Sequence, residues 1–269
     1  DISYIRKVLK VNKCLIASCG AQAQQGSDVK SGADVIELDA VAYSYGGGEL
    51  LSDMSLTITP GAFYFLTGPS GAGKTTFLKM CYAALKPTSG ALKLFGQDVR
   101  TMERNDIALV RRRIGVVHQD CQFIDHLSVA DNIALPLSVS GQDNWDDTTN
   151  LKELLAWVGL SHRANALPPE LSGGERQRAA LARAIIMSPD IVLADEPTGN
   201  VDWEMSERLL RLLLELNRMG KTVVIASHDL SLIRWAKSQV QARVFVGHQC
   251  TGHIHFTNCV EPFFDSFLH

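Results

Sequence analysis

The sequence of residues 68–75 is Gly68-Pro69-Ser70-Gly71-Ala72-Gly73-Lys74-Thr75, which has the form G-x-x-x-x-G-K-[ST] of a phosphate-binding loop. The apolar residues 62–66 before it predict a buried strand. Residues 75–85 after it predict a helix that stops at the Lys86-Pro87 pair. In such a loop, backbone N–H groups point toward one spot where phosphates lie at the positive end of the helix. We call residues 68–75 the phosphate loop.

Two side chains of the loop and one that precedes it in the sequence extend this prediction of a nucleotide site. Lys74 adds a positive charge for the β- and γ-phosphates, and the Thr75 hydroxyl is suited to ligate Mg²⁺. Tyr45, just before a run of glycines, is suited to stack on an adenine ring, the alternative being a sheet-edge aromatic without a ligand. The predicted nucleotide-binding residues are therefore Tyr45, Gly68, Pro69, Ser70, Gly71, Ala72, Gly73, Lys74, Thr75 and Thr76.

Composition excludes several other classes of protein. The 269 residues are 46% hydrophobic and 20% charged, which favours a folded chain over a disordered one. A net charge of -3 gives no reason to expect nucleic-acid binding, and we interpret the basic run of residues 111–113 as a solvated face. Six widely spaced cysteines without paired zinc spacing indicate a reducing compartment. No apolar stretch is long enough to cross a bilayer, so any membrane role requires a partner.

Two adjacent carboxylates end a short apolar segment, residues 190–196. Such a segment is typical of a parallel strand buried on both faces, with its chemistry at the carboxyl edge of the sheet. Neighbouring residues there point in opposite directions, so Asp195 is suited to Mg²⁺ and Glu196 to act as the general base for an attacking water. The alternative is a solvated turn that happens to contain two acids.

Two further strand ends carry polar side chains. Residues 114–119 predict a buried strand that ends in Gln119, whose side-chain carbonyl suits a metal or a water. Residues 221–227 predict another strand, after which His228 lies level with Glu196. A histidine in this place is able to donate to a γ-phosphate oxygen and polarise the water. The candidate catalytic residues are thus Glu196, His228 and Gln119, and the candidate Mg²⁺ ligands are Thr75, Gln119 and Asp195.

Residues 171–175, Leu171-Ser172-Gly173-Gly174-Glu175, start the last helix of a segment that is rich in helical signals and extends to about residue 187. Ser172 and Glu175 have capping-box spacing, which makes Ser172 the expected N-cap. Gly173 and Gly174 leave room for an oxyanion to approach the positive helix end. The alternative is a helix that is merely well capped. We call residues 171–175 the signature segment.

The remaining segments predict supporting elements. Short apolar runs within residues 35–66 predict a small antiparallel sheet leading to the phosphate loop, and residues 91–95 predict a further strand. Residues 203–219 form an amphipathic helical pattern. Residues 243–256 predict a closing hairpin with its turn at 247–252. Its polar tip explains His248, Cys250, His253 and His255 better than a metal site does.

Together, these motifs and the segment Gly199-Asn200-Val201-Asp202 resemble, in every motif and in order, the ATP-binding subunits of ABC transporters. The resemblance covers residues 35–256 and implies an α/β fold. That fold has a P-loop NTPase (RecA-like) core, an N-terminal antiparallel β subdomain and an α-helical signature subdomain at about 121–187. We expect one ABC ATPase domain over 34–256, a disordered tail over 1–33, and leave 257–269 unassigned.

The same resemblance implies how the site works. ABC subunits act as head-to-tail dimers in which the signature segment of one subunit closes over ATP held by the other. It implies ATP hydrolysis with Mg²⁺, because none of the catalytic positions is replaced. The implied roles are adenine stacking for Tyr45, Mg²⁺ and water coupling for Gln119, the base for Glu196, γ-phosphate sensing for His228, cross-dimer signalling for Asp202, and ATP contact in trans for Ser172, Gly173, Gly174 and Glu175.

Within the family, residues 111–120, 131–137 and 196–200 resemble the FtsE-type cell-division ATPases, although His118 stands where those proteins often carry an aromatic. That subfamily implies an FtsX-type membrane partner, a peripheral location on the cytoplasmic face of the inner membrane, and regulation of cell-wall hydrolysis. Lipoprotein-releasing and macrolide-export ATPases share residues 195–200 and are the alternative. A soluble ABC protein acting on nucleic acid would need a second cassette or a coiled-coil insertion, and the sequence has neither.

Overall fold

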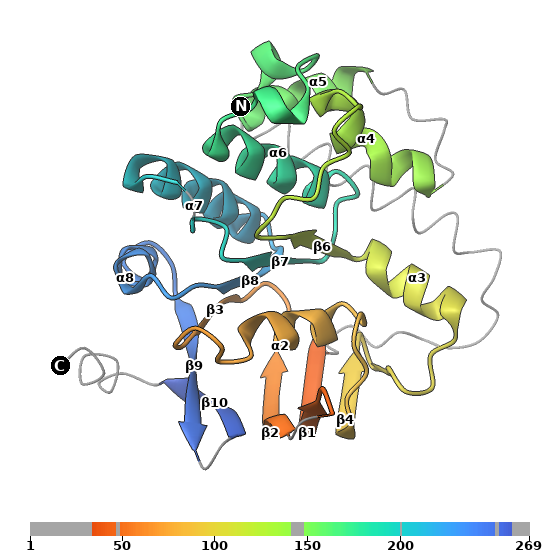
Figure 1. Cartoon of the computed structure of the whole chain (residues 1–269), viewed down its shortest axis with the longest axis vertical. Helices are drawn as coiled ribbons and strands as arrows, with labels where there is room; N and C mark the ends of the chain where they lie inside the picture. Colours follow the sequence, from red (N-terminus) through yellow and green to blue (C-terminus); the bar gives the residue numbers. More distant parts are fainter. Residues whose placement is uncertain (1–33, 47–48, 141–147, 200, 251–252, 260–269) are drawn as a thin grey trace.

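A single sheet organises the computed structural model, which describes residues 34–46, 49–140, 148–199, 201–250 and 253–259 (Figure 1). Within these residues the sheet has ten strands in the order β5-β4-β1-β2-β10-β9-β3-β8-β7-β6. The strands are β1 (Ile36–Ser44), β2 (Glu49–Ile58), β3 (Phe63–Thr67), β4 (Ser89–Leu94), β5 (Gln97–Asp98), β6 (Ile114–Val117), β7 (Ile191–Asp195), β8 (Thr222–Ala226), β9 (Ala242–Cys250) and β10 (His253–Cys259).

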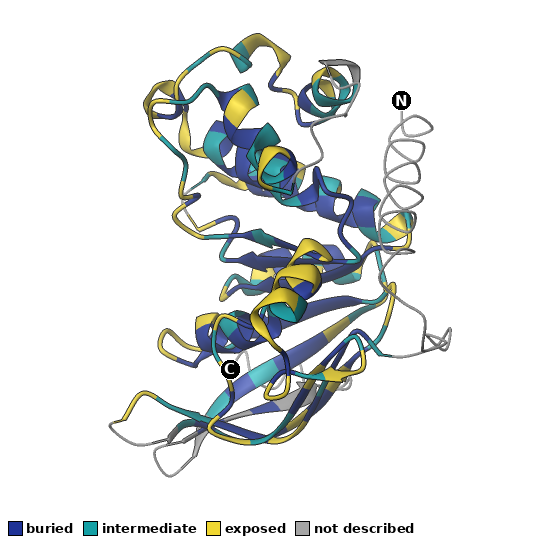
Figure 2. Cartoon of the chain, turned by 90° about the vertical axis from the view of Figure 1, so that its right-hand side faces the viewer, coloured by how far each residue is buried: buried dark blue, intermediate teal, exposed yellow. Residues whose placement is uncertain are grey.

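Helices cover both faces of the parallel half of this sheet, which confirms the predicted P-loop NTPase core. Strand residues alternate between two cores: Tyr64 and Leu66 pack on one face, Phe63 and Phe65 on the other. Both faces are buried (Figure 2), and these strands are therefore almost uniformly apolar. The first face carries α2 (Lys74–Cys81) and α3 (Arg104–Arg112); the second carries α6 (Gly173–Ile185), α7 (Trp203–Arg218) and α8 (Leu230–Lys237).

A helical layer forms a separate core beyond the sheet. It consists of α4 (Val129–Val139), α5 (Thr148–Trp157) and α6, with the short 3-10 turns η1 (Ser161–Arg163) and η2 (Pro168–Glu170). Apolar residues such as Ile133, Leu155 and Ala179 meet in its interior. Helix α6 packs against both β6 and α4, so it joins the helical layer to the sheet. The predicted richness in helices up to residue 187 is confirmed.

The predicted antiparallel sheet leading to the phosphate loop is confirmed, and the structure adds a pairing that the sequence did not predict. Strands β1, β2 and β4 are antiparallel as expected, but β10 pairs in parallel with β2 and antiparallel with β9. The C-terminal hairpin thereby joins the antiparallel strands to the parallel ones as one sheet. Its strands are also longer than predicted, leaving only residues 251–252 between them.

The helix after the phosphate loop ends at Cys81, four residues before the predicted end. Tyr82 leaves the helical conformation and Ala83 has a positive φ of 55°. The freed carbonyl oxygens of both residues accept hydrogen bonds from Arg111, at 3.1 and 3.0 Å. The basic run is therefore more than a solvated face, because Arg113 also pairs with Asp190 at 2.7 Å.

Two negative findings apply to the described part of the chain. It contains no helix with the length and apolar character needed to cross a membrane. It also contains no group of three His, Cys, Asp or Glu side chains arranged to hold a metal ion. The side chains of Cys250, His253 and His255 lie outside what the structure describes, so the hairpin-tip interpretation stays a prediction.

Candidate active site

The phosphate loop connects β3 to α2, as the sequence predicts, and close contacts favour glycine at two of its positions, Gly68 and Gly73. Gly73 is the N-cap of α2 with φ 65°, a left-handed conformation that glycine adopts without cost. A β-carbon at Gly73 would lie 2.6 Å from Leu51 Cδ2 on β2, and one at Gly68 would lie 3.0 Å from the Gly247 carbonyl oxygen on β9. Two strands of the sheet thus hold the loop closely from behind.

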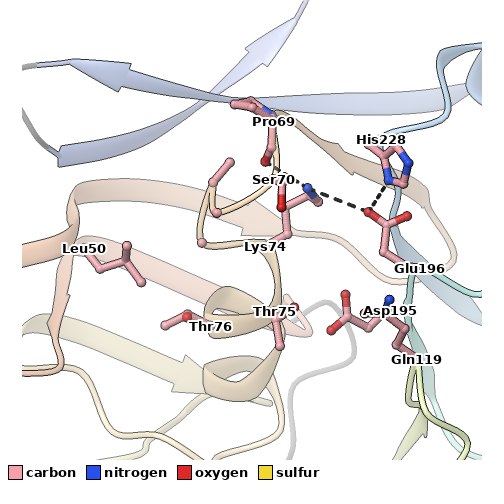
Figure 3. A pocket seen from close by; sticks show the side chains of 13 residues that line it. Leu50, Pro69, Ser70, Lys74, Thr75, Thr76, Gln119, Asp195, Glu196 and His228 are labelled. Carbon is pink, nitrogen blue, oxygen red and sulfur yellow. Dashed lines mark hydrogen bonds and ion pairs between the residues drawn. The ribbon is translucent and has the colours of Figure 1, made fainter. Parts of the chain in front are cut away.

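The loop forms one wall of a cavity of about 680 Å³ (Figure 3). The other walls bring together side chains from the ends of three parallel strands, as the sequence predicts. Leu50 on β2 was not predicted, and the only signal for it is its place after the glycine run. The lining residues are Leu50, Pro69, Ser70, Gly71, Ala72, Gly73, Lys74, Thr75, Thr76, Gln119, Asp195, Glu196 and His228.

Lys74 extends across the loop toward the second carboxylate. Its Nζ donates to the carbonyl oxygens of Gly68 at 2.9 Å and Pro69 at 3.2 Å. It also lies 3.7 Å from Glu196 Oε1. Lys74 is only 8% exposed, so its charge acts in a poorly solvated place. Because Lys74 also lines the cavity, its ammonium group is able to attract an anion there.

Glu196 lies between Lys74 and His228. His228 Nδ1 is 2.9 Å from Glu196 Oε1, which confirms that the two residues are level at the sheet edge. The parallel pairing of β7 with β8 places Asp195 opposite Ala226. Glu196 and His228, which follow these two residues in the chain, therefore lie close together. Glu196 has a φ of 45°, an uncommon conformation for a glutamate, and its N–H donates to the Ala226 carbonyl oxygen at 2.9 Å.

Asp195 faces the opposite direction, toward the phosphate loop (Figure 3). Burial raises the pKa of its carboxyl, and a hydrogen bond from Thr75 acts against that rise. Its Oδ1 is buried and has no hydrogen-bond partner among the described residues. The Asp195 carboxylate, the Thr75 hydroxyl and the carbonyl oxygen of the Gln119 side chain together offer only oxygen ligands. Mg²⁺ prefers ligands of this kind. The residues present therefore fit the ion.

Some predicted site residues lie away from the cavity wall. Tyr45 is 61% exposed; its ring is edge-on to Tyr43 at 4.8 Å and its hydroxyl is 3.2 Å from Thr76 Oγ1. Asp202 caps α7 by accepting from the Met205 N–H at 2.8 Å. Adenine stacking and cross-dimer signalling stay predictions for these two residues.

The signature segment also lies apart from the cavity of the same chain. Ser172 is the N-cap of α6 and forms the predicted capping box with Glu175. A β-carbon at Gly174 would lie 2.6 Å from Met205 Cγ, so this glycine permits close packing of α6 against the start of α7. None of Ser172, Gly173, Gly174 and Glu175 lines the described cavity.

Glu175 is expected to stabilise the protein in a pH-dependent way. The Ser172 backbone N–H lowers the pKa of the Glu175 carboxyl from 4.5 to about 2; burial opposes this, and Arg163 at 3.0 Å adds to the lowering. Because the folded-state pKa is the lower one, the stabilisation is complete above about pH 4.5 and is lost as the pH falls toward 2.

We therefore expect Glu175→Gln to lower the free energy of unfolding at pH 7 by about 0.3–1 kcal/mol, because glutamine keeps the capping-box hydrogen bond but loses the negative charge at the helix N-terminus. Urea unfolding of the variant and the parent at pH 7 and pH 3 measures the difference, which should shrink at the lower pH. Glu204→Gln, at an exposed position on α7, is the control and should change little. An equal difference at both pH values would contradict the assignment.

Comparison with known proteins agrees with this geometry. The profile described as ABC transporter matches residues 51–199. The chain is 42% identical over 209 residues to the cell division ATP-binding protein FtsE of Bacillus subtilis (strain 168), covering 77% of this chain and 92% of that protein. It is 40% identical over 200 residues to FtsE of Escherichia coli (strain K12), covering 74% of this chain and 90% of that protein.

Solved structures agree as well. The dimeric structure of a post-hydrolysis state of the ATP-binding cassette MJ0796, bound to ADP and Pi, is 31% identical with a TM-score of 0.70, covering 81% of this chain and 96% of that one. A second dimeric structure of MJ0796, a bacterial ABC transporter cassette, is 32% identical with a TM-score of 0.71 and the same coverage. The chain therefore belongs to the ABC transporter family, as an ATP-binding and ATP-hydrolysing subunit.

Proposed function

We propose that this ATPase serves a membrane complex of the cell-division type, in which an integral membrane protein of the FtsX type is its partner and cell-wall hydrolysis is regulated. Two relatives that are named as cell division ATP-binding proteins, each matched over nine tenths or more of its length, support the proposal. Its enzymatic part rests on one observation: Lys74, Glu196 and His228 converge at the wall of one cavity. ATP hydrolysis in this chain would then drive a movement of the partner.

The catalytic roles that we propose follow from the contacts. Glu196 accepts the proton of the attacking water, because its carboxylate stands at the cavity wall with only 12% of its side chain exposed. His228 orients that carboxylate through the 2.9 Å contact of its Nδ1, and in the imidazolium form, with an N–H on each ring nitrogen, it is also able to donate from Nε2 to a γ-phosphate oxygen. Lys74 holds the β- and γ-phosphates by charge. Gln119, which lines the same cavity, helps to orient the water.

Thr75, Asp195 and Gln119 are the residues that would hold Mg²⁺. The ion, when bound, neutralises charge that develops on the phosphates. Asp195 contributes the buried Oδ1, and the Thr75 hydroxyl stands beside it. In this arrangement the protein orients the oxygen ligands. Glu196 points away from them and so stays available as the general base for the water.

Asp195→Asn is expected to raise the Mg²⁺ concentration needed for half-maximal ATPase activity by about 10- to 100-fold, as for the loss of a carboxylate that orients a metal's ligands. Asparagine keeps the size of the side chain but removes its charge. Phosphate release at fixed ATP and increasing Mg²⁺ measures the shift. Asp39→Asn, an exposed position on β1, should leave the titration unchanged. An unshifted titration for Asp195→Asn would remove Asp195 from the Mg²⁺ site.

We also propose a head-to-tail homodimer. The signature segment of one subunit would complete the nucleotide site of the other, which is consistent with its distance from the cavity wall of its own chain. The printed descriptions of the two similar cassettes as dimeric support this proposal. In such a dimer, the capped start of α6 supplies backbone N–H groups to the phosphates. Asp202 would lie at the subunit interface and signal between the two sites.

The test of the partner is co-purification. The Glu196→Gln protein, with ATP and Mg²⁺, is used as bait on native membranes, because slow turnover should hold the closed form; the Lys74→Ala protein is the matched control. Recovery of an integral membrane subunit of the FtsX type, identified by mass spectrometry, would support the cell-division role and the proposed peripheral place of this ATPase on the cytoplasmic face of the inner membrane. A lipoprotein-releasing or macrolide-export subunit in its place would overturn that role and leave the ATPase chemistry unchanged.

A further inference from the structure

After Gln119, the chain makes a strained turn as it runs from β6 to the helical layer. Cys121 has a φ of 56° and Gln122 a φ of 39°, so two consecutive residues other than glycine are left-handed. Such residues persist only where the surroundings hold them. Within the turn, the Cys121 N–H donates to the His118 carbonyl oxygen at 3.0 Å and the Gln122 N–H to that of Asp120 at 2.6 Å. These contacts are local and do not fix the turn relative to the rest of the protein.

Arg183 on α6 connects this turn to the rest of the protein by hydrogen bonds. Its Nη1 donates to the Gln122 carbonyl oxygen at 2.8 Å, and its Nη2 donates to the carbonyl oxygen of Cys121. The guanidinium also lies 4.8 Å from the centre of the Phe123 ring. One planar group thus contacts three consecutive residues. A lysine ammonium has neither the fork nor the flat face that this requires.

Helix α6 reaches Gln119 at a second point as well. Gln177 Nε2 lies 3.4 Å from the Gln119 carbonyl oxygen, a long hydrogen bond. Helix α6 lies above β7 and β6 in Figure 1, and its first residues are Gly173 and Gly174. A single rigid helix therefore connects the signature segment at its start to the turn after Gln119 near its end.

We propose that Arg183 is a positioning residue for Gln119: by clamping the carbonyl oxygens of Cys121 and Gln122, it fixes where the Gln119 side chain stands in the cavity wall. The inference rests on the proposed role of Gln119 in ATP hydrolysis. Since the clamp is mounted on α6, Gln119 follows α6 whenever that helix shifts relative to the sheet. The signature segment and Gln119 would then move as one unit.

Arg183→Lys tests the proposal, with ATPase kcat and KM as the first readout. We expect kcat to fall by about 10- to 100-fold, the scale of a misplaced catalytic group, with KM for ATP changed less than threefold. Arg178→Lys is the matched control, because Arg178 lies on the same helix and also donates to two carbonyl oxygens, those of Val158 and Gly159. Its turnover should stay within about twofold of the parent. Equal losses in both variants would show a general effect on α6 and overturn the proposal.

Two double variants distinguish a role of Arg183 in positioning Gln119 from a role only in the stability of the fold. In a Gln119→Ala background, Arg183→Lys should cause no further loss, because residues that act as one unit are not additive. Gln122→Gly should restore most of the activity of Arg183→Lys, because glycine adopts a positive φ without an external hold. Independent, multiplicative losses or a failed rescue would overturn the clamp. Failure of the underlying role of Gln119 would appear separately, as unchanged turnover of Gln119→Ala alone.

Discussion

Replacing Glu196 by glutamine is expected to lower ATP turnover by at least ~10²-fold while ATP binding is retained, because general-base catalysis typically contributes on that scale. Glutamine has the size of glutamate and is able to keep a hydrogen bond to His228, but it cannot accept the proton of the water. The positive φ of Glu196 is unchanged by this substitution, so the strand end should keep its shape.

Steady-state phosphate release measures the turnover, and equilibrium titration with a fluorescent ATP analogue measures binding. Glu204→Gln, an exposed carboxylate on α7, is the matched control and should hydrolyse ATP at the parent rate. Parent-like turnover in the Glu196→Gln protein would place the general base elsewhere, and a loss of binding would mean that Glu196 mainly supports Lys74.

Lys74→Ala is expected to weaken ATP binding by about 10- to 100-fold, which corresponds to the loss of a charge-assisted hydrogen bond of about 1.5–3 kcal/mol. The ammonium group is nearly buried, and it contacts both the loop carbonyls and Glu196. Its removal takes the ammonium charge away from the phosphates and leaves the Glu196 carboxylate without its ion pair to Lys74. Turnover should fall with binding.

Titration with the same ATP analogue measures this loss. Lys79→Ala is the control, because Lys79 lies in the last turn of the same helix and does not line the cavity. Unchanged affinity in the Lys74→Ala protein would show that the backbone of the loop carries phosphate binding without the charge. Thermal unfolding of both variants distinguishes a loss of affinity from a loss of structure.

The sequence predicted best what depends on neighbours along the chain. The loop at residues 68–75 determines its own strand, turn and helix start, and the capping box of Ser172 and Glu175 requires residues only three apart. The meeting of Glu196 and His228 was also predictable. Parallel strands buried on both faces are recognisable as apolar runs, and their carboxyl ends share one edge.

Contacts between distant segments left no local pattern to recognise. The carbonyl oxygens just after the end of α2 accept from Arg111 on another helix, and the pairing of β10 with β2 joins residues about two hundred positions apart. Arg183 looked like any basic residue of an amphipathic helix, because its carbonyl acceptors are invisible in the sequence. Only the three-dimensional arrangement identifies it.

The place of the C-terminal hairpin has a consequence for the order of synthesis. Strands β9 and β10 lie between β3 and β2, so until residues 242–259 leave the ribosome both of those strands have a bare edge of unpaired backbone groups. Bare edges invite pairing with other chains. They also leave the phosphate loop without the backing of Gly247 and Ile254. The first nucleotide-binding motif to be translated is therefore among the last parts of the protein to be completed.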